Sequence, residues 1–137
     1  MYIFNDIELL LQLGKLKILG HILTQCAVTI SAIKLGEYSY AKRVAIEEQC
    51  KGIHYGHSDD QFPEWNADKR KSLTLGDLDS MYLAKTNSGT LVLSPEDFAV
   101  ERQAIQFEIP YEQVDQFITR IVKDERIIKL YNLIKVA

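Results

Sequence analysis

The stretch Thr74-Leu75-Gly76-Asp77-Leu78-Asp79-Ser80-Met81-Tyr82-Leu83-Ala84 has the features of the start of an amphipathic helix. Thr74 is a favourable N-cap residue, and Asp77 stands three residues later, as the acid of a capping box does. A carboxylate in the first turn faces the positive end of the helix dipole and stays ionised. Asp77 is therefore either a helix cap or a metal ligand, and a lone acid at this position is more often a cap. The predicted apolar face of this helix consists of Leu75, Leu78 and Tyr82.

Short apolar or β-branched runs alternate with helical patterns over the rest of the chain. Strands are predicted at residues 2–5, 27–30, 90–93 and 107–109, the last of them closed by Pro110. Helical spacing is predicted at 7–13, with a break at Gly14, and then at 16–23, 41–50, 75–84, 96–105, 114–122 and 127–136. Ser31 and Ser94 are predicted N-caps. This alternation predicts an α/β fold of three layers, with a short central parallel sheet of four to five strands, in a single domain over residues 1–137.

Residues 52–72 are more polar and rich in turn-forming residues, which predicts an irregular loop. His54 and His57 precede two acids there, but we expect a solvated loop in preference to a metal site, because no strand or helix is predicted to fix the ligands. Trp65 is expected to anchor the loop by packing against the body of the protein or against a partner.

The composition, with 47% apolar and 26% charged residues, is that of a soluble globular protein. A formal net charge of −3 gives no strong attraction to nucleic acid. Cys26 and Cys50 do not form a CxxC motif and are predicted to be reduced and buried. No apolar run approaches the length of about 18 residues that a membrane span needs, so the cytoplasm is the expected location and no membrane partner is expected.

Several acids follow predicted strands or begin predicted helices, and in a parallel sheet such positions meet at one edge. A cluster of carboxylates without a counter-charge is repulsive, and a hard divalent cation such as Mg²⁺ or Mn²⁺ relieves that repulsion. A bound cation of this kind activates water and stabilises a transferring phosphoryl group. Glu37 is expected about two turns into the helix that follows Ser31. The candidate acids are Asp6, Glu37, Asp77, Glu96 and Asp97.

The order of these acids resembles that of the PIN domain family over nearly the whole chain. Four patches carry the resemblance: Ile3-Phe4-Asn5-Asp6 followed by Leu9-Leu10-Leu11-Gln12-Leu13-Gly14-Lys15-Leu16; Val28-Thr29-Ile30-Ser31 leading to Glu37; Leu73-Thr74-Leu75-Gly76-Asp77 with Ala84; and Leu91-Val92-Leu93, Glu96-Asp97, Ala104 and Ile109-Pro110.

The resemblance implies a PIN-like fold and a Mg²⁺- or Mn²⁺-dependent endoribonuclease that cleaves single-stranded RNA. Asp6, Glu37 and Asp77 would hold the metal, and Glu96 or Asp97 would complete the site. It also implies the toxin of a toxin–antitoxin pair, with a small antitoxin protein as partner, and a homodimer. A similar group within the family is known only as predicted nucleic-acid-binding proteins.

A catalytically inactive PIN-like domain that binds nucleic acid or protein is the alternative. Ile7 and Glu8 stand where family members usually carry a small hydroxyl or amide residue, and Pro95 interrupts the pattern near the fourth acid. In the inactive domain the acids would serve as helix caps and surface charges. Contacts to the RNA backbone are predicted for the basic residues Lys42, Arg43, Lys69, Arg70 and Lys71.

Overall fold

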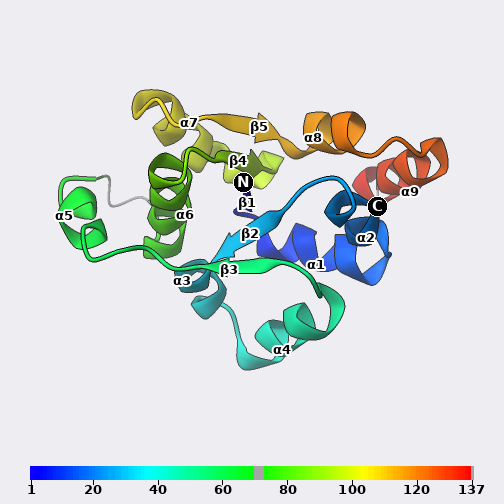
Figure 1. Ribbon diagram of the computed structural model, residues 1–137, viewed down its shortest axis with the longest axis horizontal. Helices are drawn as coiled ribbons and strands as arrows, with labels where there is room; N and C mark the ends of the chain where they lie inside the picture. The colour runs from blue at the N-terminus through cyan, green and yellow to red at the C-terminus, as the bar shows by residue number, and fades with distance from the viewer. Residues whose placement is uncertain (70–72, 137) are drawn as a thin grey trace.

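The computed structural model describes residues 1–69 and 73–136, and Arg70 and Lys71 therefore lie outside the described residues. Figure 1 shows strands and helices alternating along the chain. The elements are β1 (Tyr2–Phe4), α1 (Ile7–Lys15), α2 (Ile18–Leu23), β2 (Val28–Ser31), α3 (Ala32–Gly36), α4 (Tyr40–Gln49), β3 (His54–Gly56), α5 (Phe62–Asn66), α6 (Leu75–Thr86), β4 (Thr90–Leu93), the 3₁₀ turn η1 (Pro95–Asp97), α7 (Phe98–Gln106), β5 (Tyr111–Gln113), α8 (Val114–Ile121) and α9 (Glu125–Val136).

The strands form one five-stranded sheet in the order β3-β2-β1-β4-β5, and every neighbouring pair is parallel. The chain builds outward from β1 in one direction through β2 and β3, and then returns to add β4 and β5 on the other side of β1. The connections therefore reverse direction between β1 and β4. In open parallel sheets, ligands bind at this switch point, outside the carboxyl ends of the strands.

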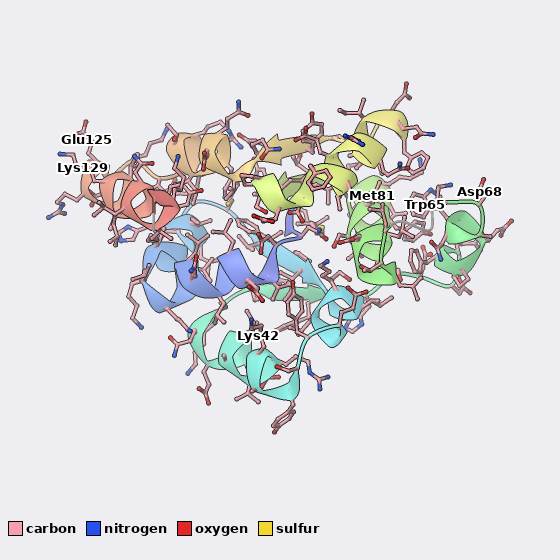
Figure 2. All side chains as sticks on the ribbon, turned by 180° about the vertical axis from the view of Figure 1, so that it is seen from behind. Lys42, Trp65, Asp68, Met81, Glu125 and Lys129 are labelled. Atoms are coloured by element: carbon pink, nitrogen blue, oxygen red, sulfur yellow. The ribbon has the colours of Figure 1, made fainter. Side chains whose placement is uncertain are left out.

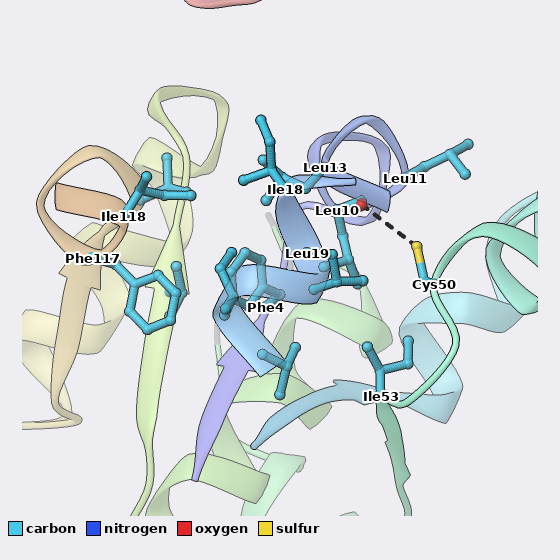
Figure 3. Packing of buried hydrophobic residues seen from close by; sticks show 14 of the residues in the cluster. Phe4, Leu10, Leu11, Leu13, Ile18, Leu19, Cys50, Ile53, Phe117 and Ile118 are labelled. Carbon is cyan, nitrogen blue, oxygen red and sulfur yellow. Dashed lines mark hydrogen bonds between the residues drawn. The ribbon is translucent and has the colours of Figure 1, made fainter. Parts of the chain in front are cut away.

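Two hydrophobic clusters cover the two faces of the sheet, because neighbouring residues of a strand point to opposite faces. Phe4 belongs to the first cluster, which contains side chains of α1, α2, α4, α8 and α9. Ile3 belongs to the second cluster, which contains side chains of α5, α6 and α7. Figure 3 shows the first cluster, where the Cys50 thiol donates a hydrogen bond of 3.5 Å to the Leu10 carbonyl oxygen. These layers confirm the predicted three-layer α/β fold and its short parallel sheet.

The predicted helix starts at Thr74 and Ser94 are confirmed. Thr74 Oγ1 accepts from the Asp77 N–H at 3.1 Å, and the Asp77 carboxylate accepts from the Thr74 N–H at 3.3 Å. Ser94 and Asp97 form the same reciprocal pair at the start of η1. The predicted apolar face of α6 is wrong at Leu75, which is 54% exposed, because Leu73, just before the helix, packs in the second cluster with Leu78 and Leu75 does not.

The predicted strand at 107–109 is wrong. Phe107 is the C-cap residue of α7, and Glu108 has a φ of 56°, which turns the chain before the strand begins at Tyr111. Pro110 precedes β5 instead of closing a strand, and its carbonyl oxygen accepts from the Leu91 N–H at 3.0 Å. A proline, which lacks an N–H, is tolerated at the start of a strand. Pro110 therefore marks the start of β5 and not, as predicted, the end of a strand.

Residues 52–69 are more regular than predicted. His54 lies on β3, which pairs with β2 through the register His54 to Thr29. Because β3 is an edge strand whose side chains are mostly exposed, it lacks the apolar alternation that identifies a strand in sequence. Trp65 lies on α5 and packs against Tyr82 with ring centroids 5.3 Å apart, which confirms that it anchors this segment on the body of the protein.

Two helix boundaries also differ from the prediction. Gly14 does not interrupt α1, and the break comes at Lys17, whose φ is 64°. Glu37 is the C-cap residue of the five-residue helix α3 and does not lie two turns into a helix. None of the helices within the described residues is both long and apolar enough to cross a membrane.

Gly14 allows α1 and α4 to approach closely, because a Cβ at this position would lie 2.4 Å from the Gln49 carbonyl oxygen and 2.8 Å from Cys50 Sγ. We expect Gly14→Ala to lower the free energy of unfolding by about 1–3 kcal/mol through overpacking. Gly20→Ala is the matched control, since a Cβ there has no neighbour within 4 Å in the described structure. Gly20→Ala should raise stability by about 0.5–1 kcal/mol. Urea denaturation measures both, and a Gly14→Ala variant as stable as Gly20→Ala would contradict the close approach.

Candidate functional site

Asn5 occupies the centre of the switch point, directly after β1. The side chain is fully buried, and its Nδ2 donates to Asp77 Oδ1 at 3.0 Å and to Asp97 Oδ1 at 2.9 Å. These two acids come from the start of α6 and the end of η1, which are far apart in sequence. One amide group therefore holds two carboxylates together at the carboxyl edge of the sheet.

Lys34 supplies a positive charge to Asp77, one of these two acids. Its Nζ lies 2.6 Å from Asp77 Oδ1 and 3.8 Å from Glu37 Oε1. Only 13% of the side chain of Lys34 and 13% of that of Asp77 are exposed, so solvent screens their attraction little. The counter-charge that clustered carboxylates require is thus supplied, at Asp77, by the protein itself.

Glu37 contacts the start of α6. Its Oε2 accepts from the Gly76 N–H at 2.7 Å, and its Oε1 accepts from Thr74 Oγ1 at 2.9 Å. Gly76 is needed for this approach, because a Cβ there would lie 2.5 Å from the Lys34 Cα and 2.8 Å from the Glu37 carboxylate. Both oxygens of Glu37 are therefore used to fix α6, which carries Asp77.

A cavity of about 770 Å³ opens beside Asn5 between the ends of β1 and β4 and helices α8 and α9. Asp6, Glu96 and Asp97 all line it. Asp6 also accepts from the Leu9 N–H at 3.0 Å through Oδ1 and so caps α1. Glu8 and Asp115 add two more acids to the wall, so acids outnumber the two lysines that line the cavity, Lys34 and Lys135.

The far wall of the cavity is closed by α9. Tyr131 is buried and donates a hydrogen bond of 2.6 Å to Asp115 Oδ1, and Lys135 Nζ lies 3.0 Å from Asp115 Oδ2. Burial alone would raise the pKa of Asp115, but these two contacts outweigh it and hold the pKa below its ordinary value. Asp115 therefore ties the C-terminal helix to α8 and is satisfied within the protein.

Burial and neighbouring charges shift the pKa values of Asp77 and Asp97 in opposite directions. Burial opposes the ionisation of Asp77, but the hydrogen bonds from Lys34 and Asn5 are stronger together and lower its pKa. Burial also raises the pKa of Asp97, where the hydrogen bonds from the Ser94 N–H and Asn5 do not offset it and the charges of Asp6 and Asp77 raise the pKa further. Burial disfavours the ammonium of Lys34, yet Asp77 more than compensates and raises the pKa of Lys34.

A divalent cation fits the chemistry of the donors, although the site is not shaped around one. Asp77 and Asp97 offer the carboxylate oxygens that Mg²⁺ and Mn²⁺ prefer. Asn5 Oδ1 is buried and has no hydrogen-bond partner among the described residues, which leaves one amide oxygen without a donor. Within residues 1–69 and 73–136, however, no three His, Cys, Asp or Glu side chains are grouped so that they could hold a metal ion as they stand.

The structure therefore brings together part of the predicted site. Asp77 and Asp97 meet through Asn5, and Asp6, Glu96 and Asp97 share one cavity. Glu37 lies next to Lys34 but does not line the cavity. Sequence reasoning missed Asn5 and Lys34, because it looked only for carboxylates at this edge of the sheet. Asn5 could have been found from its place at the carboxyl end of β1. Lys34 lies on a helix of only five residues, and no sequence pattern indicates which way its side chain points.

The residues between β3 and α5 act locally. Asp59 Oδ1 accepts from Tyr82 Oη at 2.5 Å and from the Gln61 N–H at 3.0 Å, which fixes this segment on α6. His54 and His57 are both exposed. In the described part of the chain they belong to no group that could hold a metal.

The basic residues predicted to contact RNA that the structure describes lie in separate places. Figure 2 shows Lys42 far from Trp65, the residue against which Lys69 packs. Lys42 pairs with Glu8 at 2.6 Å and so lies at the rim of the acidic cavity. Arg43 lines a different cavity of about 560 Å³ beside α3. Lys69 lies 4.6 Å from the centre of the Trp65 ring and pairs with Asp68. Of these three residues, only Lys42 is close to the acids.

The sequence matches no known protein-family model, and no curated protein shows significant similarity to it.

Asp77→Asn should destabilise the protein by about 2 kcal/mol at pH 7, because it removes a charged hydrogen bond to Lys34. Asp77 has a lowered folded-state pKa, so its contribution is fully present above the unfolded value of about 3.9 and is lost as the pH falls through the folded value. The difference from wild type should therefore shrink below about pH 4. Urea denaturation as a function of pH measures it.

Asp97→Asn is the matched contrast. Asp97 has a raised folded-state pKa, so protonation stabilises the fold at low pH and this contribution is lost as the pH rises through the folded value. Asp97→Asn should accordingly lower the free energy of unfolding at pH 7 less than Asp77→Asn does. It should also make the free energy of unfolding less dependent on pH above the ordinary carboxyl range. Equal destabilisation by the two variants at every pH would contradict the electrostatic asymmetry of the site.

Proposed function

We propose that this chain is a PIN-like, Mg²⁺- or Mn²⁺-dependent endoribonuclease that acts on single-stranded RNA. The observation that supports this proposal is the shared hydrogen-bonding partner of Asp77 and Asp97. Both carboxylates lie within 3.0 Å of Asn5 Nδ2 at the switch point of a parallel sheet. Asn5 and Asp97 line the adjoining cavity together with Asp6 and Glu96, whereas Asp77 lies behind Asn5 and Lys34 and does not line it. Partly burying acids of like charge together costs stability, which is the kind of cost that proteins retain at functional sites.

Each acid has a distinct part in this proposal. Asp77 and Asp97 would hold the cation, with Asp6 and Glu96 completing its surroundings directly or through water. When bound, the cation supplies an activated water and stabilises negative charge on the transferring phosphoryl group. Glu37 fixes the first turn of α6 through the Gly76 N–H, and so sets the position of Asp77.

RNA must approach a cavity whose wall is largely acidic, so positive charge at its rim would be useful. Lys42 is at that rim, with its Nζ 2.6 Å from Glu8 Oε1. In the proposal Lys42 contacts a phosphate and contributes a salt-dependent, sequence-independent part of the binding free energy. The PIN resemblance further suggests a cytoplasmic toxin that forms a homodimer and is neutralised by a small antitoxin protein, and these features rest on that resemblance alone.

A second candidate is a catalytically inactive PIN-like domain that binds nucleic acid or protein. Lys34 favours it, because its ammonium already compensates the charge of Asp77 at 2.6 Å without a metal. The Asn5 amide adds a second donor to the same oxygen at 3.0 Å. In this alternative the acids fix α1, α6 and η1 as helix caps, and the cavity takes no divalent cation.

Cleavage of a labelled single-stranded RNA with and without Mn²⁺ tests the first function. We expect Mn²⁺-stimulated cleavage that falls about 100-fold or more in Asp77→Asn and in Asp97→Asn, because losing a ligand costs at least as much as losing an outer-shell partner. Asp68→Asn is the control, since Asp68 is exposed and lies next to Lys69, away from the cavity. Cleavage that persists in both site variants, or in excess chelator, would contradict the nuclease proposal.

The placement of the basic residues gives an independent prediction for RNA binding. Lys42→Ala should reduce the slope of log K against log salt concentration by about 1 and weaken binding to all sequences equally. Lys69→Ala should have a smaller effect, because Lys69 lies against Trp65 and Phe107 at another part of the molecule. Fluorescence anisotropy at several salt concentrations measures both slopes, and an unchanged slope in Lys42→Ala would exclude this contact.

A further inference from the structure

Lys34 is held at Asp77 by the backbone of α3 and not only by its flexible side chain. The Lys34 N–H donates to Ser31 Oγ at 2.9 Å, so Lys34 lies in the first turn of a helix that Ser31 caps. Ser31 Oγ in turn donates to Asp79 Oδ2 at 2.5 Å, and both of these residues are fully buried. Asp79 belongs to α6, the same helix that carries Asp77. The network therefore fixes the register of Lys34 relative to Asp77.

The packing of α3 on α6 fixes the same register. Gly76 lies directly under Lys34, where an added Cβ would come within 2.5 Å of the Lys34 Cα. The Lys34 ammonium then reaches Asp77 at 2.6 Å and stays 3.8 Å from Glu37. An ordinary surface lysine has none of these constraints, and exposed ion pairs contribute little to stability.

Asn5 provides a second and independent observation at this site. Its Nδ2 bridges the two aspartates, whereas its buried Oδ1 has no donor among the described residues. A buried oxygen without a donor is costly and is normally satisfied by protein, water or an ion. The side chain that contacts Asp77 and Asp97 therefore also carries a buried oxygen acceptor without a donor among the described residues.

We propose that Lys34 is a built-in counter-ion that competes with the divalent cation for Asp77 and thereby sets the metal affinity of the site. This inference rests on the proposed function. Lys34 is one of the residues that line the cavity, and in this proposal its ammonium turns toward the cavity when a cation binds. Without metal, the ion pair keeps Asp77 compensated and the start of α6 ordered.

The competition has a simple consequence for affinity. A cation that binds at Asp77 must break the contact between Lys34 Nζ and Asp77 Oδ1, and the net affinity is reduced by the free energy of that contact. Removing the ammonium while keeping the aliphatic stem should therefore tighten metal binding. Keeping a positive charge at the same position should not.

Isothermal titration of the full chain with Mn²⁺ measures this effect. We expect Lys34→Met to lower the Kd for Mn²⁺ about tenfold or more, because a hydrogen bond between charged groups no longer has to be broken. Lys34→Arg should keep a Kd close to that of wild type. Lys135→Met is the matched control, since Lys135 lines the same cavity but pairs with Asp115 at 3.0 Å. It should change the Kd less than about threefold, as screening weakens a more distant charge.

The outcomes separate this inference from the proposed function. Tighter Mn²⁺ binding than wild type in Lys34→Met, but not in Lys34→Arg or Lys135→Met, supports Lys34 as the counter-ion. Binding only in Lys34→Met supports it too, and places the wild-type protein in the second, metal-free candidate class. Equal affinity in wild type and Lys34→Met overturns the inference and leaves the nuclease proposal standing. Absence of Mn²⁺ binding in every variant overturns both.

A measurement on the wild-type protein decides the question even if Lys34→Met does not fold. In protein labelled with ¹³C at lysine Cε, the Lys34 resonance is identified by its loss in Lys34→Arg. On titration with Mg²⁺ this resonance should shift in proportion to site occupancy, while the Lys135 resonance stays in place. An unmoved Lys34 resonance at saturating Mg²⁺ would show that the ammonium is not displaced, and would overturn the inference.

Discussion

The carboxylates of Asp77 and Asp97 are brought toward each other where the parallel sheet reverses its strand order, and the surrounding structure must compensate their charge. Asn5 does so with one amide that reaches both acids, and Lys34 does so with an ammonium on Asp77. Because only Asp77 receives the Lys34 ammonium, the pKa of Asp77 is lowered while that of Asp97 is raised. The better compensated acid is the one that begins α6, and the less compensated one faces the cavity.

Much of the packing around the site serves this arrangement. Gly76 permits α3 to lie against the start of α6, and Glu37 fixes the same turn through its N–H. Ser31 and Asp79 link β2, α3 and α6 through a buried hydrogen bond. On the other side of the cavity, Asp115 ties α9 to α8 through Tyr131. The acids therefore lie on rigid elements, as a site for a cation or a charged ligand requires.

The fold could be predicted largely from local signals. The capping pairs at Thr74 and Ser94, together with the alternation of short apolar runs and helical spacing, were sufficient for the layered α/β architecture. The errors have physical causes. The edge strand β3 lacks an apolar pattern because its side chains are mostly exposed, and the positive φ of Glu108 moves the start of β5 beyond Pro110. The site was predicted only in part, because Asn5 and Lys34 act through three-dimensional neighbours that no sequence spacing specifies.

We propose that a divalent cation displaces the Lys34 ammonium from Asp77 and binds beside Asp77, Asp97 and Asn5. A crystal structure of the protein with millimolar Mn²⁺, with anomalous data collected above the manganese absorption edge, would locate this cation. We expect an anomalous peak within coordination distance of Asp77 and Asp97, with the Lys34 side chain turned away from Asp77 into the cavity. An absent peak, with Lys34 still hydrogen-bonded to Asp77, would contradict it.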